Sequence, residues 1–591
     1  MEATRLFDIP FVSKEKYGVI PDFLCRKIKG EGWKKYSTDE AIEHITLLSY
    51  AFLKMGVKKG DRIAVISSNR PEWNFLDHAI QSVGAIMCPI YPTISDSEYD
   101  YILNHAGVRF LFSEGKELFN RLNEVIKNVP TIEERFTFAN LDDGYRHLDD
   151  LYELGKDNPQ PEKLAEIRAS VAEDDVATII FTSGTTGEPK GVMLTHKNIL
   201  GNVIGLLGIP PTTHPAKGLS FLPLCHVYER AVNYHYQLFG YSCYYAENVA
   251  TVAADSAEIK ANIMVAVPRV IEKVYDKMYT AGASMPWIQK SIYYWALKLA
   301  RHYNPFKKKF LYQLRRKVAD ILVYRKLRAV LGGQVSCIIS GGAAIQEKML
   351  RFMNGIGILT LEGYGLSETA PVVAVNRFPL ESQRYGTVGR VMPGVEIRIA
   401  EDDEILVRGY CVMKGYYNNE AATAEVIDKG HWFHTGDLGS IDKDGFLKIT
   451  GRKKSLFKTS FGKFVNPIVV EDKFKESPFI DQIMVVGDGQ KFAAAIITLD
   501  WDFMHVWWKR HKLGKFPKDH QEVIAHKDVL ERLAKEVKKY NKNFGHHEQI
   551  FRFKLLPDVW SPETKELSQT LKVRRKYVEP KYKEVIDKLF E

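Results

Sequence analysis

A loop rich in glycine and hydroxyl groups, with one lysine, constrains this chain more than any other segment. Residues 182–191 are TSGTTGEPKG and follow an apolar run, 176–181, that predicts a buried strand. A helix is expected over 198–206, shortly after the loop. Glycines let backbone N–H groups approach an anion closely, hydroxyls add donors, and lysine adds positive charge. The loop therefore predicts a polyphosphate-binding site.

The spacing within this loop differs from that of a Walker P-loop, because two residues separate Gly187 from Lys190. An ordinary glycine-rich turn is the alternative interpretation of the same residues. The segments that surround the loop in the sequence are therefore needed to decide between the two.

Further apolar runs predict strands over 62–66, 85–90, 335–339 and 358–361. Two of them lead directly into glycine-containing loops, SGGAA at 340–344 and EGYG at 362–365. Strands that alternate with helical patterns favour an α/β domain with largely parallel sheets. In such sheets ligands gather beyond the carboxyl ends of the strands. All three loops suspected of binding a nucleotide follow predicted strands.

The length of 591 residues is too great for one ordinary hydrophobic core, so two or more domains are expected. After Gly451 a basic run, 452–454, is followed by short alternating strands and helices. We therefore predict a large domain over 1–451 and a small C-terminal domain over 452–591.

Composition narrows the class of protein and its compartment. Hydrophobic residues are 45% and charged residues 26%, as in a globular protein, and the net charge of +9 suits polyanionic substrates or anionic lipid. The six cysteines form no CxxC pair, so neither a zinc ribbon nor a disulfide framework is predicted. Residues 1–8 lack the apolar core of a signal peptide, and no apolar run reaches the ~18 residues of a spanning helix. We expect a cytoplasmic protein that binds no nucleic acid; its oligomeric state is not predicted.

Residues 268–331 are aromatic and basic, with apolar residues at helical spacing and Pro305 between two expected helices. One interpretation is peripheral contact with the inner face of an anionic membrane. A solvated helical face is the alternative. The residues that suggest the contact are Tyr293, Tyr294, Trp295, Lys307, Lys308, Lys309, Arg315, Arg316 and Lys317.

The loop at 182–191 resembles the signature of the adenylate-forming ligases, the superfamily of acyl-CoA synthetases, luciferases and peptide-synthetase adenylation domains. Other matching segments follow in the same order, from about Tyr36 to Arg575. Within the superfamily the chain is most similar to the AMP-forming long-chain fatty acid–CoA ligases, which also carry a helical insertion like 268–331. The resemblance implies an α/β fold with a large N-terminal domain of parallel-rich sheets layered with helices and a small, mobile α+β C-terminal domain.

The resemblance also implies the reaction. Mg²⁺·ATP and a fatty acid would give acyl-AMP and pyrophosphate, and the thiol of coenzyme A would then displace AMP. The small domain would rotate between the two steps. Two alternatives stay open: transfer to a free acyl carrier protein, and a catalytically silent lipid-binding membrane scaffold. The charged residues expected of an active ligase are nevertheless all present: Lys190, Glu368, Asp437, Arg452 and Lys572.

For the nucleotide, the resemblance implies a role for each matching residue. Glu368 would bind the Mg²⁺ that bridges the phosphates, and Ser367 would contact the α-phosphate, where many relatives have threonine. Tyr364 would stack on adenine. Asp437 and Arg452 would bind the ribose. The other nucleotide residues are Thr182, Ser183, Gly184, Thr185 (also near the metal), Thr186, Lys190, Gly341, Gly342, Ala343, Glu362, Gly363 and Gly365.

For the acyl group and coenzyme A, the resemblance implies further roles. His226, in the run LPLCHVYER, would lie near the carboxylate end of the acyl pocket. Lys572 would bridge the carboxylate and the α-phosphate, Lys454 would be the hinge, and Gly462 would border the pantetheine tunnel. Tyrosines and a phenylalanine after His226 either line the acyl pocket or belong to the core: Tyr228, Tyr234, Tyr236 and Phe239. A Cys225–His226 nucleophile is rejected, because the thiol of coenzyme A is the nucleophile this chemistry needs.

Overall fold

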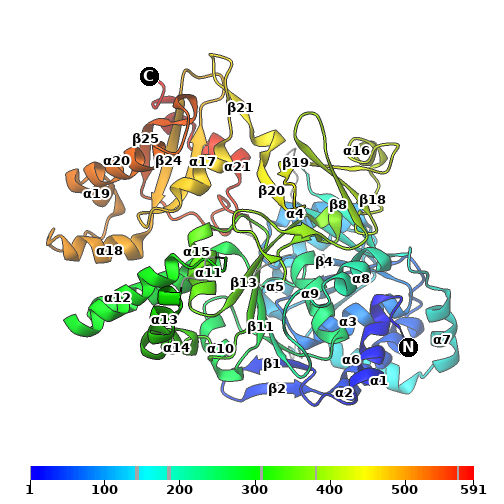
Figure 1. Ribbon diagram of the computed structural model, residues 1–591. Coiled ribbons are helices and arrows are strands. Elements are labelled where there is room, and N and C mark those ends of the chain that lie inside the picture. Colours follow the sequence, from blue (N-terminus) through cyan, green and yellow to red (C-terminus); the bar gives the residue numbers. More distant parts are fainter. Residues whose placement is uncertain are drawn as a thin grey trace. The chain divides into compact units, whose positions relative to one another are not determined.

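The computed structural model describes residues 2–139, 141, 145–182, 188–306, 310–379, 382–568 and 571–591, which form two compact units (Figure 1). The first unit comprises Met1–Arg398, Leu406–Thr435 and Ile441–Lys448. The second comprises Ile399–Ile405, Gly436–Ser440 and Ile449–Glu591. The boundary expected at Gly451/Arg452 stays a prediction, because the chain alternates between the units from 399 to 448.

A seven-stranded sheet of the first unit has the order β18–β8–β7–β4–β3–β5–β6. The strands from β7 to β6 are parallel to their neighbours, and β8 and β18 add antiparallel pairs at one edge. Runs such as Arg62–Ile66 are buried on both faces, as expected of parallel strands. The strands are β3 (Arg62–Ile66), β4 (Ile86–Ile90), β5 (Phe110–Ser113), β6 (Glu134–Thr137), β7 (Val176–Thr182), β8 (Lys190–Thr195) and β18 (Gly415–Tyr416).

A nine-stranded sheet of the same unit has the order β15–β14–β13–β12–β11–β9–β10–β1–β2. Its six central strands, from β13 to β1, are parallel, and antiparallel pairs close both edges. The strands are β1 (Leu24–Ile28), β2 (Gly32–Tyr36), β9 (Lys217–Ser220), β10 (Ser242–Tyr245), β11 (Ile263–Ala266), β12 (Cys337–Ser340), β13 (Leu359–Gly365), β14 (Val372–Val375) and β15 (Arg390–Val391).

Two helices, α3 and α9, are buried along their whole length. Arg230 of α9 donates to Thr178 of β7 at 2.7 Å, and Asn233 of α9 donates to Ser220 of β9 at 3.1 Å. The helix α9 therefore lies between the two sheets. The helices of this unit are α1 (Ile9–Tyr17), α2 (Thr38–Lys54), α3 (Pro71–Ser82), α4 (Asp96–Ala106), α5 (Gly115–Ile126), α6 (Leu148–Asp157), α7 (Pro161–Ser170), α8 (His196–Gly205), α9 (Val227–Leu238), α10 (Val252–Ile259), α11 (Pro268–Thr280), α12 (Trp287–Arg301), α13 (Phe310–Ala319), α14 (Arg325–Ala329), α15 (Glu347–Gly355) and α16 (Glu420–Ala424).

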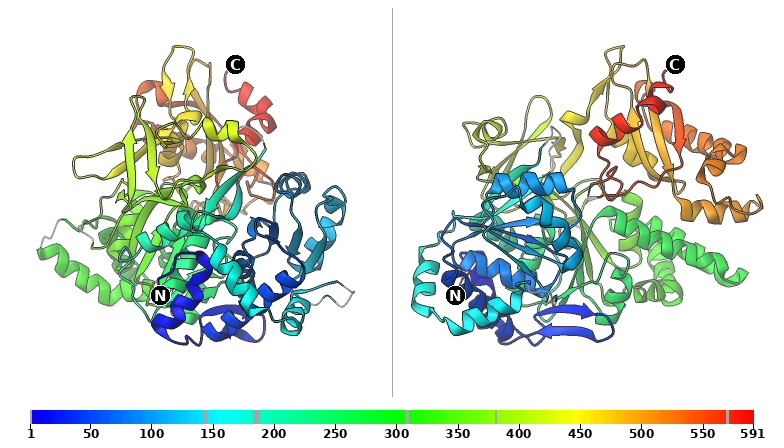
Figure 2. Two further views of the ribbon diagram at one scale, coloured as in Figure 1. Left: turned by 90° about the vertical axis from the view of Figure 1, so that its right-hand side faces the viewer. Right: turned by 180° about the vertical axis from the view of Figure 1, so that it is seen from behind.

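The second unit contains a sheet of three strands with a hydrophobic core on each face. Alternate residues of β24 enter the two cores: Ala495 and Ile497 pack with α17–α20, whereas Ala494 and Ile496 pack with α21 and α22. Figure 2 shows the orange helices on one side of this sheet and the red ones on the other. The elements are β21 (Phe457–Lys458), β22 (Phe464–Val465), α17 (Pro467–Phe474), β23 (Ile480–Val486), β24 (Ala493–Leu499), α18 (Trp501–Arg510), α19 (His520–Ala525), α20 (Lys527–Asn541), β25 (Ile550–Leu556), α21 (Arg575–Lys581) and α22 (Lys583–Asp587).

The remaining strands form a four-stranded sheet in the order β16–β17–β19–β20. Short 3₁₀ segments occur at chain turns, including η4 (Ser367–Thr369) and η6 (Lys453–Ser455), and a π-helical turn, η3 (Asp320–Tyr324), joins α13 to α14. Within the part of the chain that the structure covers, no helix is both long enough and apolar enough to span a bilayer. The strands of the four-stranded sheet are β16 (Val395–Ile399), β17 (Glu404–Gly409), β19 (Phe433–Ile441) and β20 (Leu447–Arg452).

The predicted α/β class is confirmed, as are the predicted strands, with β3 at the predicted bounds. The helix predicted from 198 begins earlier, because Thr195 accepts a hydrogen bond from Asn198 N at 3.1 Å and caps α8 at His196. The loop predicted at 362–365 is wrong. These residues continue β13, since Gly363 and Tyr364 pair with β14. Pro305 separates α12 from α13, as predicted.

Candidate functional site

The two ends of the glycine-rich loop are held together by a hairpin. Thr182 is the last residue of β7 and Lys190 the first of β8, and the two are paired in register. This pairing brings the lysine back to the carboxyl end of β7, the position that α/β sheets use for ligands. The remaining loop residues assigned to the phosphates lie outside the described residues: Ser183, Gly184, Thr185 and Thr186.

Glu368 lies in η4, directly after β13, and is only partly exposed. Its Oε1 accepts a hydrogen bond from the hydroxyl of Tyr416 at 3.0 Å. The ammonium of Lys190 lies 4.8 Å from the centroid of the same tyrosine ring. One buried tyrosine therefore contacts both charged groups that the sequence assigned to the phosphates and the metal. Tyr416 was not predicted as a site residue, because no charge or spacing distinguishes the run GYY at 415–417.

The chemistry of Glu368 fits a magnesium ion that is shared with substrate. Mg²⁺ is usually held by one or two carboxylates together with substrate phosphates and waters. Because Tyr416 donates to Oε1 of Glu368, the carboxylate keeps further acceptor positions for a cation. Ser367 stands beside it in the same turn, and the hydroxyl of Thr369 closes that turn by accepting from Leu366 N at 2.9 Å.

The segments assigned to adenine are neighbours in the nine-stranded sheet. The strands β12 and β13 are parallel, with Ser340 opposite Glu362. The loop after β12, with Gly341, Gly342 and Ala343, therefore begins beside the end of β13, which carries Tyr364. Glu362 itself is buried and accepts from Ile345 N at 3.2 Å, so its carboxylate supports that loop.

Backbone packing explains one glycine of this group. A Cβ on Gly365 would lie 1.7 Å from the carbonyl oxygen of Pro371, where the chain turns back into β14. Any side chain at this position would have to displace backbone. Gly365 is therefore required for close backbone packing. A Cβ on Gly363 would lie no nearer than 3.4 Å to any neighbouring atom, so packing does not require glycine there.

The segment assigned to the acyl group forms the start of α9. His226 is the N-cap, and its Nδ1 accepts from Tyr228 N at 3.2 Å, so in the neutral ring the proton is on Nε2. Tyr228 donates to Ile339 O at 3.0 Å, and its ring lies 3.0 Å from where a Cβ of Gly341 would be. The acyl segment and the loop after β12 are therefore in contact.

Other side chains of α9 belong to the core. Tyr234 and Tyr236 of α9 are buried, as is Phe239 directly after the helix, and Tyr234 donates to the carboxylate of Asp77. Burial raises the pKa of the Cys225 thiol, which agrees with the rejection of a cysteine nucleophile. Burial also raises the pKa of Glu229 to about 8, against smaller opposing effects of Ser220 and Leu222, so this carboxyl is largely protonated at neutral pH.

The second unit carries the residues assigned to the ribose. Asp437 of β19 is buried, and its Oδ1 lies 3.3 Å from Nε of Arg452, at the end of β20. Lys453 is held by Asp402 at 2.5 Å and by Glu404 at 3.2 Å. The contact between Asp437 and Arg452 pairs the two residues assigned to the ribose. The contacts of Lys453 restrain the residue that follows Arg452.

Lys572 belongs to the same electrostatic neighbourhood of the second unit. Desolvation is the largest effect that lowers the pKa of the Lys572 ammonium group, and the like charge of Arg452 is the second. The residue is nevertheless exposed. The opposite charges of Asp437 and Asp472 partly offset this lowering of the pKa. Within this unit the structure therefore brings together Asp437, Arg452 and Lys572.

The other two residues assigned to the second unit lie at turns. Lys454 is exposed in η6. Gly462 has a φ of +78° in the turn between β21 and β22, a conformation that favours glycine, and donates to Thr459 O at 2.8 Å.

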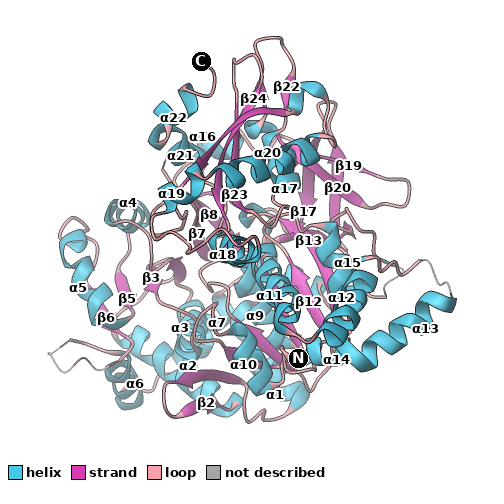
Figure 3. Cartoon of the chain, turned by 90° about the vertical axis from the view of Figure 1, so that its left-hand side faces the viewer, coloured by secondary structure: helices cyan, strands magenta, loops and turns pink. Residues whose placement is uncertain are grey.

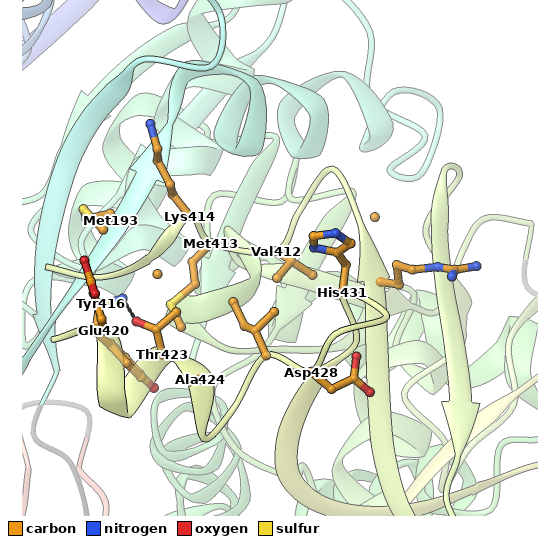
Figure 4. A pocket seen from close by; sticks show the side chains of 14 residues that line it. Met193, Val412, Met413, Lys414, Tyr416, Glu420, Thr423, Ala424, Asp428 and His431 are labelled. Atoms are coloured by element: carbon orange, nitrogen blue, oxygen red, sulfur yellow. Dashed lines mark hydrogen bonds between the residues drawn. The ribbon is translucent and has the colours of Figure 1, made fainter.

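An open cavity of about 660 Å³ lies beside Tyr416 (Figure 4). No sequence motif predicted this cavity. Met413, which lines the cavity, also donates its backbone N–H to Glu368 O at 2.9 Å. The segment that lines this cavity is therefore bonded to the turn that carries Glu368. The side chains labelled around it are Met193, Val412, Met413, Lys414, Tyr416, Glu420, Thr423, Ala424, Asp428 and His431.

Comparison with known proteins identifies two family models along the chain. Residues 21–417 match the AMP-binding enzyme family, and residues 455–591 match the AMP-binding enzyme C-terminal domain. A long-chain-fatty-acid–CoA ligase, FadD15 of Mycobacterium bovis, is 36% identical over 96% of this chain and 95% of its own length. Long chain acyl-CoA synthetase 1 of Arabidopsis thaliana is 29% identical over 100% of this chain and 93% of its own.

A solved structure shows the same fold. ATP-bound MatB from Rhodopseudomonas palustris superposes with a TM-score of 0.71 at 19% identity, covering 99% of this chain and 100% of that one. Together with the family models, this likeness confirms the predicted architecture of a large N-terminal sheet domain followed by a smaller C-terminal domain.

Proposed function

Because this chain belongs to the AMP-binding enzyme family, we propose that it is a long-chain fatty acid–CoA ligase. It activates the fatty acid with ATP to an acyl-adenylate and then transfers the acyl group to coenzyme A. The relative at 36% identity over 96% of the chain supports this substrate class. The observation that carries the proposal is the cluster of Lys190, Tyr416 and Glu368, which sets a cation and a carboxylate on one tyrosine.

In the first step a carboxylate oxygen of the fatty acid attacks the α-phosphorus of ATP, and pyrophosphate leaves with the electrons of the broken P–O bond. Lys190 neutralises phosphate charge, and Ser367 donates to the α-phosphate. Glu368 would hold Mg²⁺, which would supply further neutralisation of the phosphates when bound. Lys572 stabilises the negative charge shared by the carboxylate and the α-phosphate.

In the second step the sulfur of coenzyme A attacks the acyl carbonyl, the thiol proton is released, and AMP leaves with the electrons of the broken C–O bond. His226 lies near the acyl carbonyl, and its Nδ1 accepts from the backbone N–H of Tyr228 in α9. Asp437 and Arg452 hold the ribose of the nucleotide. Lys454 is the hinge and Gly462 borders the pantetheine arm.

A thioester assay over a panel of carboxylic acids, from acetate to oleate, tests this function. We expect pyrophosphate and acyl-CoA to form with long-chain acids, magnesium and ATP, and to decline as the acid becomes shorter. Replacing coenzyme A with acyl carrier protein in the same assay distinguishes the carrier-loading alternative. A protein that releases no pyrophosphate with any acid is not a ligase, and the silent scaffold would then be the better interpretation.

We also propose that the helices α12 and α13 dock the enzyme on an anionic membrane surface. Figure 3 shows α12, α13 and α14 grouped together in the first unit. One face of α12 is buried, through Tyr293, Ala296 and Ala300. The opposite face is exposed and mixes Ile288 and Trp295 with Lys298. Trp287 is 78% exposed and Phe310 of α13 is 83% exposed. The exposed large apolar residues of α12, α13 and η3 are Trp287, Ile288, Ile292, Trp295, Phe310, Leu311, Leu314, Val318, Ile321 and Leu322.

Charge supports a lipid partner for this face. No aspartate or glutamate stands between Asp276 and Asp320 in the sequence, whereas exposed cations accompany the apolar residues. Tryptophan and leucine beside lysine and arginine are the composition of helices that lie in a membrane interface. Tyr293 was predicted to contact the membrane, but it is buried in the helix packing. The residues Lys307–Lys309 lie outside the described residues. The exposed cations are Lys290, Lys298, Arg315, Lys317, Arg325 and Lys326.

Co-sedimentation with vesicles of phosphatidylglycerol and phosphatidylcholine tests this docking. We expect binding at low salt that weakens at high salt, because screening reduces the attraction of each cation. The double variant Trp287→Ser/Phe310→Ser should bind about tenfold more weakly, and so should Arg315→Gln/Lys317→Gln.

The matched control is Ile204→Ser/Leu207→Ser, which removes two exposed apolar side chains elsewhere in the first unit and should bind like the wild type. Wild-type protein that stays in solution at low salt would show that the α12–α13 face is only solvated.

A further inference from the structure

We propose that Tyr416 is a positioning residue for the nucleotide: its hydroxyl orients Glu368 and its ring restrains Lys190. This inference rests on the proposed function, since both neighbours are assigned to the phosphates and the metal. Tyr416 is 7% exposed and lies at the end of the short strand β18.

The hydrogen bond from Tyr416 fixes the rotamer of Glu368. A glutamate side chain loses rotational freedom when it must present its carboxylate in one direction. The O–H···O distance of 3.0 Å from Tyr416 to Oε1 supplies that restraint within the protein itself. The carboxylate is therefore oriented before a cation binds, so less conformational entropy is lost on binding.

The tyrosine ring restrains Lys190 without occupying its donors. The ammonium lies 4.8 Å from the ring centroid, within the range of a cation–π contact. The face of an aromatic ring attracts the charge but accepts no strong hydrogen bond, so the three N–H donors of lysine stay available for phosphate oxygens.

Tyr416 also keeps the two opposite charges apart. Among the described side chains, Lys190 and Glu368 form no ion pair with each other, although both contact the same tyrosine. Without the ring, the flexible lysine would be attracted to the carboxylate. Such a pair would neutralise both groups in the free enzyme and would compete with Mg²⁺·ATP for each of them.

The backbone around Tyr416 is fixed to the elements that it orients. Tyr416 pairs with Val192 of β8, and its N–H donates to Thr423 at 2.9 Å. On either side, Tyr417 N donates to Gly191 O at 2.7 Å and Met413 N donates to Glu368 O at 2.9 Å. The strand is therefore bonded both to β8, which begins with Lys190, and to the turn that carries Glu368.

The test compares two variants of Tyr416 with a matched hydroxyl deletion. Tyr416→Phe removes only the hydrogen bond, and Tyr416→Leu also removes the ring. Tyr410→Phe is the control, because the Tyr410 hydroxyl has no hydrogen-bond partner among the described residues. Melting temperature, the KM for Mg²⁺·ATP in pyrophosphate exchange, and thioester formation from supplied acyl-AMP are measured for each.

We expect Tyr416→Phe to raise the KM for Mg²⁺·ATP about three- to tenfold, the loss expected for one hydrogen bond of ordinary strength. Tyr416→Leu should raise it further, Tyr410→Phe should match the wild type, and thioester formation from acyl-AMP should change little in all three. In a Glu368→Gln background, Tyr416→Phe should have a much smaller effect, because the charged acceptor is already gone.

Two outcomes would overturn the positioning role. One is a KM of Tyr416→Phe equal to that of the wild type, and the other is an equal change in KM when Tyr416→Phe is made in the wild type and in Glu368→Gln. Failure of the proposed function looks different. In that case the wild type itself would bind no Mg²⁺·ATP and release no pyrophosphate with any acid, and both conclusions would be wrong.

Discussion

Replacing Lys572 with alanine should slow acyl-adenylate formation by roughly 10²–10³-fold, the usual loss for one electrostatic stabiliser of a transition state. Negative charge accumulates where the fatty carboxylate meets the α-phosphate, and Lys572 is the group we assign to that charge. Desolvation and the neighbouring Arg452 lower the pKa of its ammonium group, and the residue is exposed. A substrate anion beside this cation would offset the repulsion from Arg452.

Pyrophosphate exchange and single-turnover thioester formation separate the two steps for this variant. We expect the first to fall and the second, started from supplied acyl-AMP, to keep most of its rate. Lys576→Ala is the matched control, since Lys576 is an exposed lysine of α21 four positions along the chain. Equal damage to both steps by Lys572→Ala would refute the role assigned to this lysine.

The backbone before Lys572 is held in an unusual conformation. Leu571 has a φ of +60°, which is uncommon for a residue with a side chain. Ser568 N donates to Lys572 O at 2.7 Å, and Lys572 N donates to the Ser568 hydroxyl at 3.1 Å, so two hydrogen bonds join Lys572 to Ser568. Strained turns of this kind concentrate at functional sites, where they orient a side chain.

Motifs with a local chemical signature were predictable from the sequence. The loop at 182–191 combines glycines, hydroxyls and a lysine, and the structure places its two ends in register at the end of β7. Asp437 and Arg452 stand fifteen positions apart, and their side chains meet at 3.3 Å. In each case the residue type itself indicates that the site binds an anion or a hydroxyl group, so no tertiary information was needed.

Contacts that depend on sheet register were not predictable. Tyr416 meets Glu368 only because β18 adds to the edge of β8, next to the turn that follows β13. No local pattern in a two-residue strand encodes that pairing. The fate of the α9 aromatics was equally open, since core and pocket both favour tyrosine. The structure decides for the core at Tyr234, whose hydroxyl reaches a buried carboxylate.

Asp77 and Arg230 form the most buried ion pair among the described residues, and breaking this pair should have the largest effect on stability. The side chains of Asp77 and Arg230 are 0% and 1% exposed. Arg230 donates to both oxygens of Asp77 and, at 2.7 Å, to Thr178 of β7, while Gln81 donates to Asp77 at 2.6 Å. Asp77→Ala would leave a buried, uncompensated cation, which costs about 3–5 kcal/mol.

Hydrogen exchange of peptides from α3, α9 and β7 measures this loss directly, because a chain with two compact units need not unfold in one two-state transition. We expect their exchange in Asp77→Ala to accelerate by about two to three orders of magnitude, since each 1.4 kcal/mol is about tenfold. Peptides of the second unit should exchange as in the wild type.

The double variant Asp77→Leu/Arg230→Met separates the ion pair from ordinary packing. It removes both charges while keeping apolar volume, and replacing a buried pair in this way is often neutral or stabilising. We therefore expect its α3 and α9 peptides to recover most of the lost protection. Because α9 begins at the cap His226 and β7 ends at Thr182, recovery should also restore pyrophosphate release. A double variant that is less protected than Asp77→Ala would show that the geometry of these hydrogen bonds, and not charge compensation, holds the two helices and the strand together.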